Sequence, residues 1–159
     1  MKRIIFVAKS GTIREPMAAG ILQEFVLNQE IEVLARGLVV SFPEPMNQKA
    51  EAVLISNGIA MENFTSVPLT EEDITEDTLI LTMETEHRQK VLSRFQNATE
   101  EKVFVLTEFV GDELEILNPY GGSLQAYGLC YETLRKSIKK LVKLLERTAT
   151  SNTVTCVYE

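Results

Sequence analysis

The sequence predicts an α/β fold with three layers, doubly wound, in which a four-stranded parallel sheet carries helices on both faces. Segments rich in β-branched residues alternate with segments of helical periodicity along the chain. Residues 4–7 form a short continuous apolar run, which is typical of a strand buried on both faces. Strands joined by helices make right-handed crossovers, and such crossovers give a parallel sheet.

The expected elements alternate in chain order. The strands are expected at residues 4–7, 31–35, 78–83 and 103–106. The helices are expected at residues 16–28, 47–57, 85–96 and in a long closing helix that begins near residue 124. The third strand is expected to be central in the sheet.

Proline and glycine mark several of these boundaries. Pro16 suits the first turn of a helix, where its missing N–H costs nothing. Gly37 stops the second strand, and Pro43 and Pro45 break the chain before the next helix. Gly58 can end that helix.

The closing helix shows the clearest periodicity. Its apolar residues recur at intervals of three and four, namely Leu124, Tyr127, Tyr131, Leu134, Ile138, Leu141 and Leu145. Residues 1–149 are therefore expected to form a single domain, and residues 150–159 a polar C-terminal tail that could be disordered.

Composition excludes several classes of function. Hydrophobic residues make up 45% of the 159 residues, which is enough for a packed core. The formal net charge of −7 argues against nucleic acid as a partner, since phosphate backbones are bound by basic surfaces. Neither a signal-peptide core nor a membrane span is visible, so a soluble, cytoplasmic protein is expected. No Cys/His cluster has the spacing of metal ligands, so neither a metal nor a cofactor is expected.

Two loops should lie at the carboxyl ends of the strands, where ligands bind in such sheets. One spans residues 8–15 and joins the first strand to a helix N-terminus; the other spans residues 118–123. Converging backbone N–H groups and the helix dipole in the first loop could hold an oxyanion, and Arg14 could add a bidentate contact. The candidate phosphate-binding residues are Lys9, Ser10, Gly11, Thr12, Ile13, Arg14 and Glu15. By spacing alone, an ordinary strand-to-helix turn is an equal alternative.

Motifs in both loops resemble those of the low-molecular-weight protein tyrosine phosphatases. In the first loop the matching residues are Val7, Thr12, Arg14, Pro16, Met17 and Ala18. Further similarity lies at residues 68–72, at Thr82, Met83 and His87, and at residues 102–104 and 119–123. The resemblance covers nearly all of residues 1–147 and implies the flavodoxin-like fold of this family. Thr12 makes the chain most similar to bacterial members, including the protein-arginine phosphatases.

The resemblance also implies which chemical groups are missing. In the family, a cysteine thiolate attacks phosphorus and an aspartate before Pro-Tyr acts as general acid and base. Ala8 stands at the cysteine position and Asn118 at the aspartate position, so neither group can do its chemistry. Pro119 and Tyr120 are expected to line the cleft.

Other positions of the family network differ as well. Ser10 and Gly11 replace a Gly-Asn pair whose asparagine braces the loop, and Glu15 replaces a hydroxyl residue that stabilises the thiolate. Ala35 and Phe64 fall where the family has a supporting serine and histidine. These changes predict loss of the whole catalytic apparatus.

The sequence therefore predicts a catalytically inactive homologue, a pseudophosphatase that binds a protein partner or a phospho-residue. The alternative is an active phosphotyrosine or phosphoarginine phosphatase with an unorthodox nucleophile, for which Ser10 lacks a visible base. Arg14 and the loop amides favour weak phosphate binding and Glu15 opposes it, because its carboxylate could satisfy the helix N-terminus or pair with Arg14 in place of the anion. His87 is interpreted as structural or solvated, and Cys130 as buried. No nucleic-acid or membrane partner is expected, and the sequence does not indicate an oligomeric state.

Overall fold

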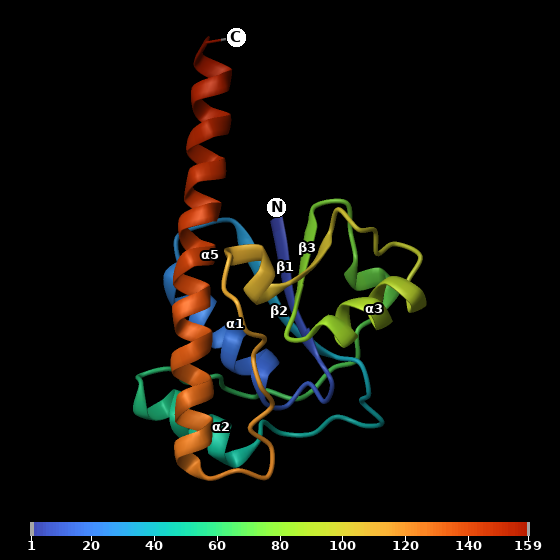
Figure 1. Cartoon of the computed structure of the whole chain (residues 1–159), viewed down its shortest axis with the longest axis vertical. Coiled ribbons are helices and arrows are strands. Elements are labelled where there is room, and N and C mark those ends of the chain that lie inside the picture. The colour runs from blue at the N-terminus through green and yellow to red at the C-terminus, as the bar shows by residue number, and fades with distance from the viewer. Residues whose placement is uncertain (1, 159) are drawn as a thin grey trace.

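Four parallel strands form a single sheet in the computed structural model, which describes the backbone of residues 2–158 and the side chains of residues 2–147 (Figure 1). The strands are β1 (Lys2–Ala8), β2 (Ile31–Gly37), β3 (Thr78–Thr82) and β4 (Val103–Val105), in the spatial order β2-β1-β3-β4. All three neighbouring pairs are parallel. β3 lies inside the sheet, as predicted.

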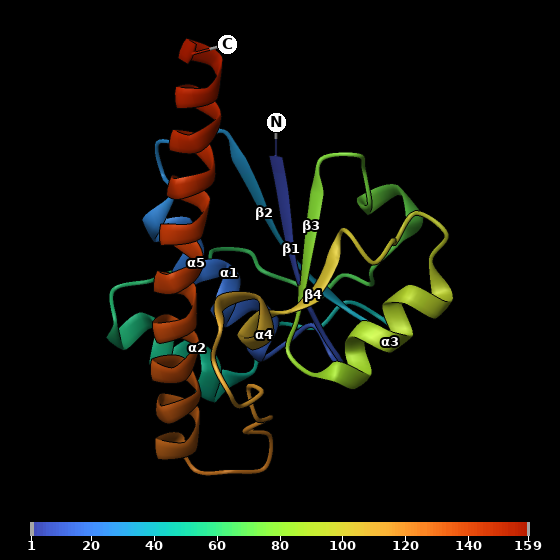
Figure 2. The same ribbon diagram turned by 45° about the horizontal axis from the view of Figure 1, so that its top comes forward.

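Helices cover both faces of this sheet. They are α1 (Arg14–Phe25), α2 (Gln48–Ser56), α3 (Thr85–Arg94), α4 (Leu106–Val110) and α5 (Leu124–Tyr158), with a single 3₁₀ turn at Glu71–Asp73. Figures 1 and 2 show α1, α2 and α5 together on one face and α3 on the other. The predicted α/β architecture, a doubly wound four-stranded parallel sheet with helices on both faces, is confirmed.

Alternation along β1 explains why both faces need helices. Successive side chains of a strand point to opposite faces. Ile4 and Phe6 join the larger core cluster beneath α1 and α5, whereas Ile5 and Val7 join a smaller cluster that includes Val91 of α3. The continuous apolar run of residues 4–7 is thus buried on both sides only because the sheet lies between two layers of helices.

Several element boundaries differ from the predicted ones. β1 begins at Lys2 and ends at Ala8, because the parallel ladder with β2 pairs these residues with Ile31 and Gly37 although they lie outside the apolar run. β2 includes Gly37, and α1 begins at Arg14, before Pro16. α4 was not predicted; its five residues are too few for periodicity to reveal.

The closing helix is longer than its apolar pattern indicated. Its backbone runs from Leu124 through Tyr158. Side chains of residues 148–159 lie outside the described part of the chain, so the expected tail at residues 150–159 stays a prediction. Within the described residues, none of the helices combines the length and the apolar character that crossing a membrane would need.

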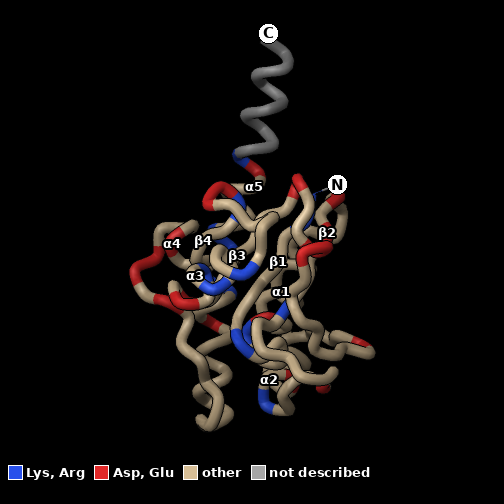
Figure 3. Tube along the Cα trace, turned by 90° about the vertical axis from the view of Figure 1, so that its right-hand side faces the viewer, with Lys and Arg blue, Asp and Glu red and all other residues tan. Residues whose placement is uncertain are grey.

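Charged residues are unevenly placed over this scaffold. Figure 3 shows acidic residues along α4 and the segment that follows it, where Glu108, Asp112, Glu113 and Glu115 succeed one another. Asp112 ties this segment to α5, because it accepts a hydrogen bond from Ser137 Oγ at 2.6 Å and pairs with Lys140. The segment between α4 and α5 is therefore held against α5 at its start.

Candidate functional site

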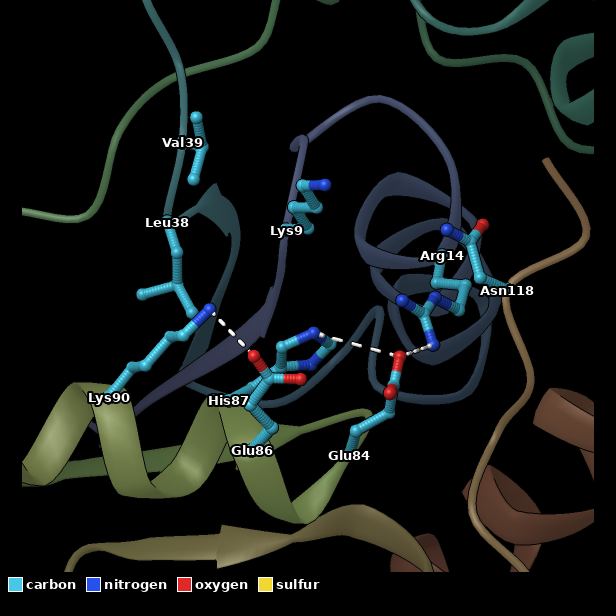
Figure 4. A pocket seen from close by; sticks show the side chains of 9 residues that line it. All are labelled: Lys9, Arg14, Leu38, Val39, Glu84, Glu86, His87, Lys90 and Asn118. Carbon is cyan, nitrogen blue, oxygen red and sulfur yellow. Dashed lines mark hydrogen bonds and ion pairs between the residues drawn. The ribbon is translucent and has the colours of Figure 1, made fainter.

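Two adjoining pockets open at the carboxyl ends of the strands, around the loop between β1 and α1. The first, of about 240 Å³, is called here the loop pocket and is lined by Ala8, Lys9, Ser10, Thr12, Ile13, Arg14, Glu15, Glu44, Asn118 and Tyr120. The second, of about 190 Å³, is called the α3 pocket and is lined by Lys9, Arg14, Leu38, Val39, Glu84, Glu86, His87, Lys90 and Asn118 (Figure 4). The two predicted loops, residues 8–15 and 118–123, therefore meet in space.

The loop after β1 is held by a close approach of two glycines. Gly11 has φ +78°, a left-handed conformation that favours glycine. A Cβ atom on Gly37 would lie 2.8 Å from the Gly11 nitrogen, so the end of β2 can touch the loop only because residue 37 has no side chain. Backbone hydrogen bonds from Val39 N to Lys9 O and from Asn47 N to Thr12 O fix the loop further, at 2.8 and 3.0 Å.

The Glu15 carboxylate lies inside this loop. Its side chain belongs to a residue only 1% exposed, and its Oε2 accepts a hydrogen bond from the Gly11 N–H at 2.6 Å. α1 has no side-chain N-cap at Ile13, so Glu15 supplies the acceptor that the helix start lacks. The carboxylate thus occupies the donors that the sequence assigned to an external oxyanion.

Burial raises the pKa of the Glu15 carboxyl above its ordinary value of 4.5. The backbone N–H groups of Glu15, Gly11 and Ile13 and the charge of Arg14 act in the opposite direction and partly offset that cost. Glu15 is thus a buried acid whose negative charge is matched by backbone donors and not by a salt bridge.

Arg14 is held by Glu84 and by the Ile116 carbonyl. It is 2% exposed, and its Nη1 donates to Glu84 Oε2 at 2.7 Å and to the Ile116 carbonyl at 2.6 Å. Glu15 was expected either to satisfy the helix N-terminus or to pair with Arg14. In the structure Glu15 satisfies the helix N-terminus, and Arg14 pairs with Glu84. Glu84 was not identified from the sequence, because it lies 70 residues from Arg14 and no local signal links them.

His87 is buried beside the same network. Its Nε2 lies 3.7 Å from Glu84 Oε2, and its Nδ1 has no hydrogen-bond partner among the described residues. Burial lowers the pKa of His87, which Glu84 only partly opposes. A buried neutral imidazole in this place agrees with the structural interpretation of His87.

Two positions at which lost chemical groups were expected from the sequence, Ala8 and Asn118, both line the loop pocket. Ala8 is buried at the base of the loop pocket and contributes only a methyl group. Asn118 is exposed, and its Oδ1 accepts a hydrogen bond from Tyr120 N at 3.1 Å. Ser10 Oγ and Thr12 Oγ1 lie 2.9 Å apart and bond each other, so neither hydroxyl contacts a base.

The remaining candidate residues divide into two groups. Tyr120 lines the loop pocket, whereas Pro119 is buried and lines neither pocket. Ala35 and Phe64 face a separate pocket beside β2, away from the loop. Cys130 is buried, and desolvation raises the pKa of its thiol to about 11.

Glu44, Leu38 and Val39 line the site without having been predicted, since nothing in their local sequence marks a binding residue. A search of the described residues finds no group of three or more His, Cys, Asp or Glu side chains arranged to hold a metal ion.

Comparison with known proteins places this architecture in one family. A family model described as low molecular weight phosphotyrosine protein phosphatase matches residues 3–151. The chain is 33% identical over 147 residues to the protein-arginine-phosphatase of Bacillus subtilis, which covers 91% of this chain and 97% of the relative. It is 31% identical over 143 residues to the low molecular weight protein-tyrosine-phosphatase PtpB of Staphylococcus aureus, covering 90% and 99%.

Solved structures agree with these matches. The arginine phosphatase from Geobacillus stearothermophilus superimposes with a TM-score of 0.87 at 30% identity, covering 95% of this chain and 97% of that one. The low molecular weight protein tyrosine phosphatase from T. tengcongensis superimposes with a TM-score of 0.84 at 31% identity, covering 90% and 99%. Because the family model matches residues 3–151 and relatives more than 30% identical cover about nine tenths of the chain, the chain belongs to the low molecular weight phosphotyrosine protein phosphatase family.

Proposed function

We propose that this chain is a catalytically inactive member of its family, a pseudophosphatase that acts by binding a partner. One observation carries the proposal: the Glu15 carboxylate fills the phosphate-binding loop and accepts the Gly11 N–H. Loss of the nucleophile at Ala8 could be a single accident, but an internal anion in the loop is a second and independent obstacle to the same reaction.

The chemical step lacks both of its reacting groups. Transfer of a phosphoryl group to the enzyme needs a nucleophile in line with phosphorus, and the Ala8 methyl cannot serve. Protonation of the leaving group needs an acid, and the Asn118 amide cannot supply a proton at useful pH. Removal of a nucleophile from an otherwise intact phosphatase costs on the order of 10⁴ to 10⁶ in rate.

Binding of phosphate in the loop is opposed as well. A phosphate oxygen would have to displace the Glu15 carboxylate from Gly11 or share the site with it. Two unit negative charges about 4 Å apart repel by up to roughly 4 kcal/mol at an effective dielectric near 20. Arg14 cannot compensate fully, since its Nη1 is committed to Glu84 and Ile116.

Turnover of p-nitrophenyl phosphate, phosphotyrosine peptide and phosphoarginine tests the proposal, with the unchanged protein compared against Arg14→Ala. We expect no turnover above the uncatalysed rate with any of the three substrates. Turnover by the unchanged protein that Arg14→Ala abolishes would show that the chain is an active phosphatase with an unorthodox nucleophile.

Isothermal titration with phosphate and with a phosphorylated peptide tests the binding half. We expect no heat of binding at millimolar concentrations near neutral pH. Millimolar or tighter binding that is lost on Arg14→Ala would instead identify a reader of phosphorylated residues.

The relatives come from bacteria, which supports a bacterial origin. A cytoplasmic location stays a prediction.

A further inference from the structure

Three side chains form the wall that the loop pocket and the α3 pocket share. Lys9 comes from the loop after β1, Arg14 is the first residue of α1, and Asn118 lies in the segment before α5. In Figure 4 these three side chains end in nitrogen atoms around the same part of the pocket. Two parts of the chain that are distant in sequence, the loop with Lys9 and Arg14 and the segment with Asn118, thus present hydrogen-bond donors to one space.

Each of the three has a donor to spare. Both hydrogen bonds of Arg14 leave from Nη1, so its Nη2 has no partner among the described residues and points toward Lys9 (Figure 4). Asn118 uses Oδ1 to accept from Tyr120, which leaves its amide N–H₂ group available. Lys9 is exposed and has no ion-pair partner within 4 Å in the described part of the chain.

The charges around this wall favour an anion of low charge. Glu84 is paired with Arg14, and Glu86 is paired with Lys90 at 2.9 Å, so the α3 pocket carries the unpaired positive charge of Lys9. An aspartate at position 118 would oppose an anion here, whereas the Asn118 amide can donate to one. The replacement that removes the general acid therefore adds a donor.

A carboxylate fits this arrangement better than a phosphate. The Gly11 amide is taken by Glu15, so a phosphate placed at the wall would lack this donor of the loop. A dianion would also be repelled more strongly than a monoanion by the nearby carboxylates, Glu15, Glu44, Glu84 and Glu86. The apolar side chains of Leu38 and Val39 can cover the carbon chain that carries a carboxylate.

We propose that Lys9, Arg14 and Asn118 form a carboxylate-binding site, through which the protein holds an acidic, unphosphorylated segment of a partner. The proposal rests on the proposed function, since it names the chemistry of the partner that an inactive homologue would bind. The carboxylate comes from an aspartate or glutamate side chain or from a chain terminus.

Titration of the full chain at pH 7.5, followed by ¹⁵N–¹H correlation spectra, tests this site with three probes. They are acetyl-glutamate amide, which has only a side-chain carboxylate, acetylglycine, which has only a terminal one, and inorganic phosphate. We expect at least one carboxylate probe to shift the amide signals of Lys9 and Asn118 with a Kd in the millimolar range. The tighter of the two identifies the source, and phosphate should bind at least fivefold more weakly.

Matched variants separate the site from general electrostatics. Asn118→Asp and Lys9→Ala should each weaken carboxylate binding at least tenfold. Asn28→Asp, beyond the C-terminal end of α1, and Lys139→Ala, on the exposed face of α5, make the same charge changes elsewhere and should leave the Kd within twofold.

Three results would overturn the assignment: no binding of either carboxylate, tighter binding of phosphate, or carboxylate binding that Asn118→Asp leaves unchanged. Failure of the proposed function has a different signature. Phosphatase turnover by the unchanged protein would refute inactivity whatever the carboxylate probes do, whereas a protein without turnover that ignores both probes would refute only the carboxylate site.

Discussion

The loop after β1 buries two charged side chains, Arg14 and Glu15, whereas the segment between α4 and α5 exposes three large apolar or aromatic side chains. Arg14 and Glu15 are almost fully buried and find their partners inside the molecule. Leu114, Leu117 and Tyr120 are 80%, 82% and 75% exposed. Both regions border the same cleft. The loop after β1 is therefore closed by contacts within the molecule, whereas the segment before α5 presents apolar surface to solvent.

The largest expected effect comes from reopening the inward-facing loop. We expect Ala8→Cys with Asn118→Asp to restore little or no phosphatase turnover, because a thiol beside the buried Glu15 carboxylate would stay protonated and phosphate could not enter. Adding Glu15→Ser should raise the turnover of p-nitrophenyl phosphate by about a thousandfold or more over that double variant.

A matched control keeps this result interpretable. Glu44→Ser in the same double variant removes the other carboxylate of the loop pocket and should leave turnover low. Full activity in the double variant with Glu15 intact would show that this carboxylate does not block the loop.

The next effect concerns the burial of Arg14. Glu84→Gln removes the charged partner of a buried guanidinium, which typically costs about 3 kcal/mol of unfolding free energy. Glu86→Gln breaks an exposed ion pair with Lys90 and should cost much less, because solvent screens such a pair. Urea denaturation of both variants measures the difference; equal small losses would mean that Arg14 does not depend on Glu84.

Titration of Glu15 should give stability a characteristic dependence on pH. The folded-state pKa of Glu15 is raised above 4.5, so the folded state binds this proton more tightly. The contribution of Glu15 to unfolding free energy therefore falls as pH rises from about 4.5 through the folded pKa, and is level above it. Denaturation over this pH range should show that the unfolding free energy of the unchanged protein falls relative to that of Glu15→Gln as pH rises.

Glu86 serves as a control, because its contribution to unfolding free energy should depend on pH in the opposite direction. Its pKa is lowered, chiefly by the hydrogen bond from Lys90, so its contribution is present above 4.5 and is lost as pH falls through the folded pKa. A difference for Glu15→Gln with the same sign as that for Glu86→Gln would contradict the assignment of Glu15 as a desolvated acid.

The smallest effect is expected on the outward-facing segment. Leu117→Ser should change unfolding free energy by less than about 0.5 kcal/mol, since an exposed side chain loses little packing. Its neighbour Ile116 is fully buried, and Ile116→Ala should cost about 3 kcal/mol. Thermal denaturation of the pair checks this, and a large loss in Leu117→Ser would show that the segment is packed and not open.

The sequence was sufficient for elements that have many local signals. The apolar run in β1 and the periodicity of α5 predicted both elements because burial of a strand or a helix face repeats at a fixed spacing. α4 has too few residues for such a repeat. Ends such as Lys2 and Ala8 depend on ladder partners in β2, which local sequence does not reveal.

The candidate site shows the same division. The loop, Ala8 and Asn118 could be located from motifs along the chain. The partner of Glu15 could not be chosen from the sequence. Its carboxylate could accept hydrogen bonds either from the helix N-terminus or from Arg14, and only the position of Arg14 decides between them. That position depends on Glu84 and on the Ile116 carbonyl, which are brought to the loop only by the fold.

The hydrogen bond between Glu15 and the Gly11 amide is what closes the loop to an external anion. The ¹⁵N–¹H signal of Gly11, followed as a function of pH, measures that bond directly. We predict that the Gly11 amide signal shifts with a single titration step centred above pH 4.5, and that this step is absent in Glu15→Gln and unchanged in Glu44→Gln. A Gly11 signal that does not titrate, or that titrates equally in Glu15→Gln, would contradict the presence of the carboxylate in the loop.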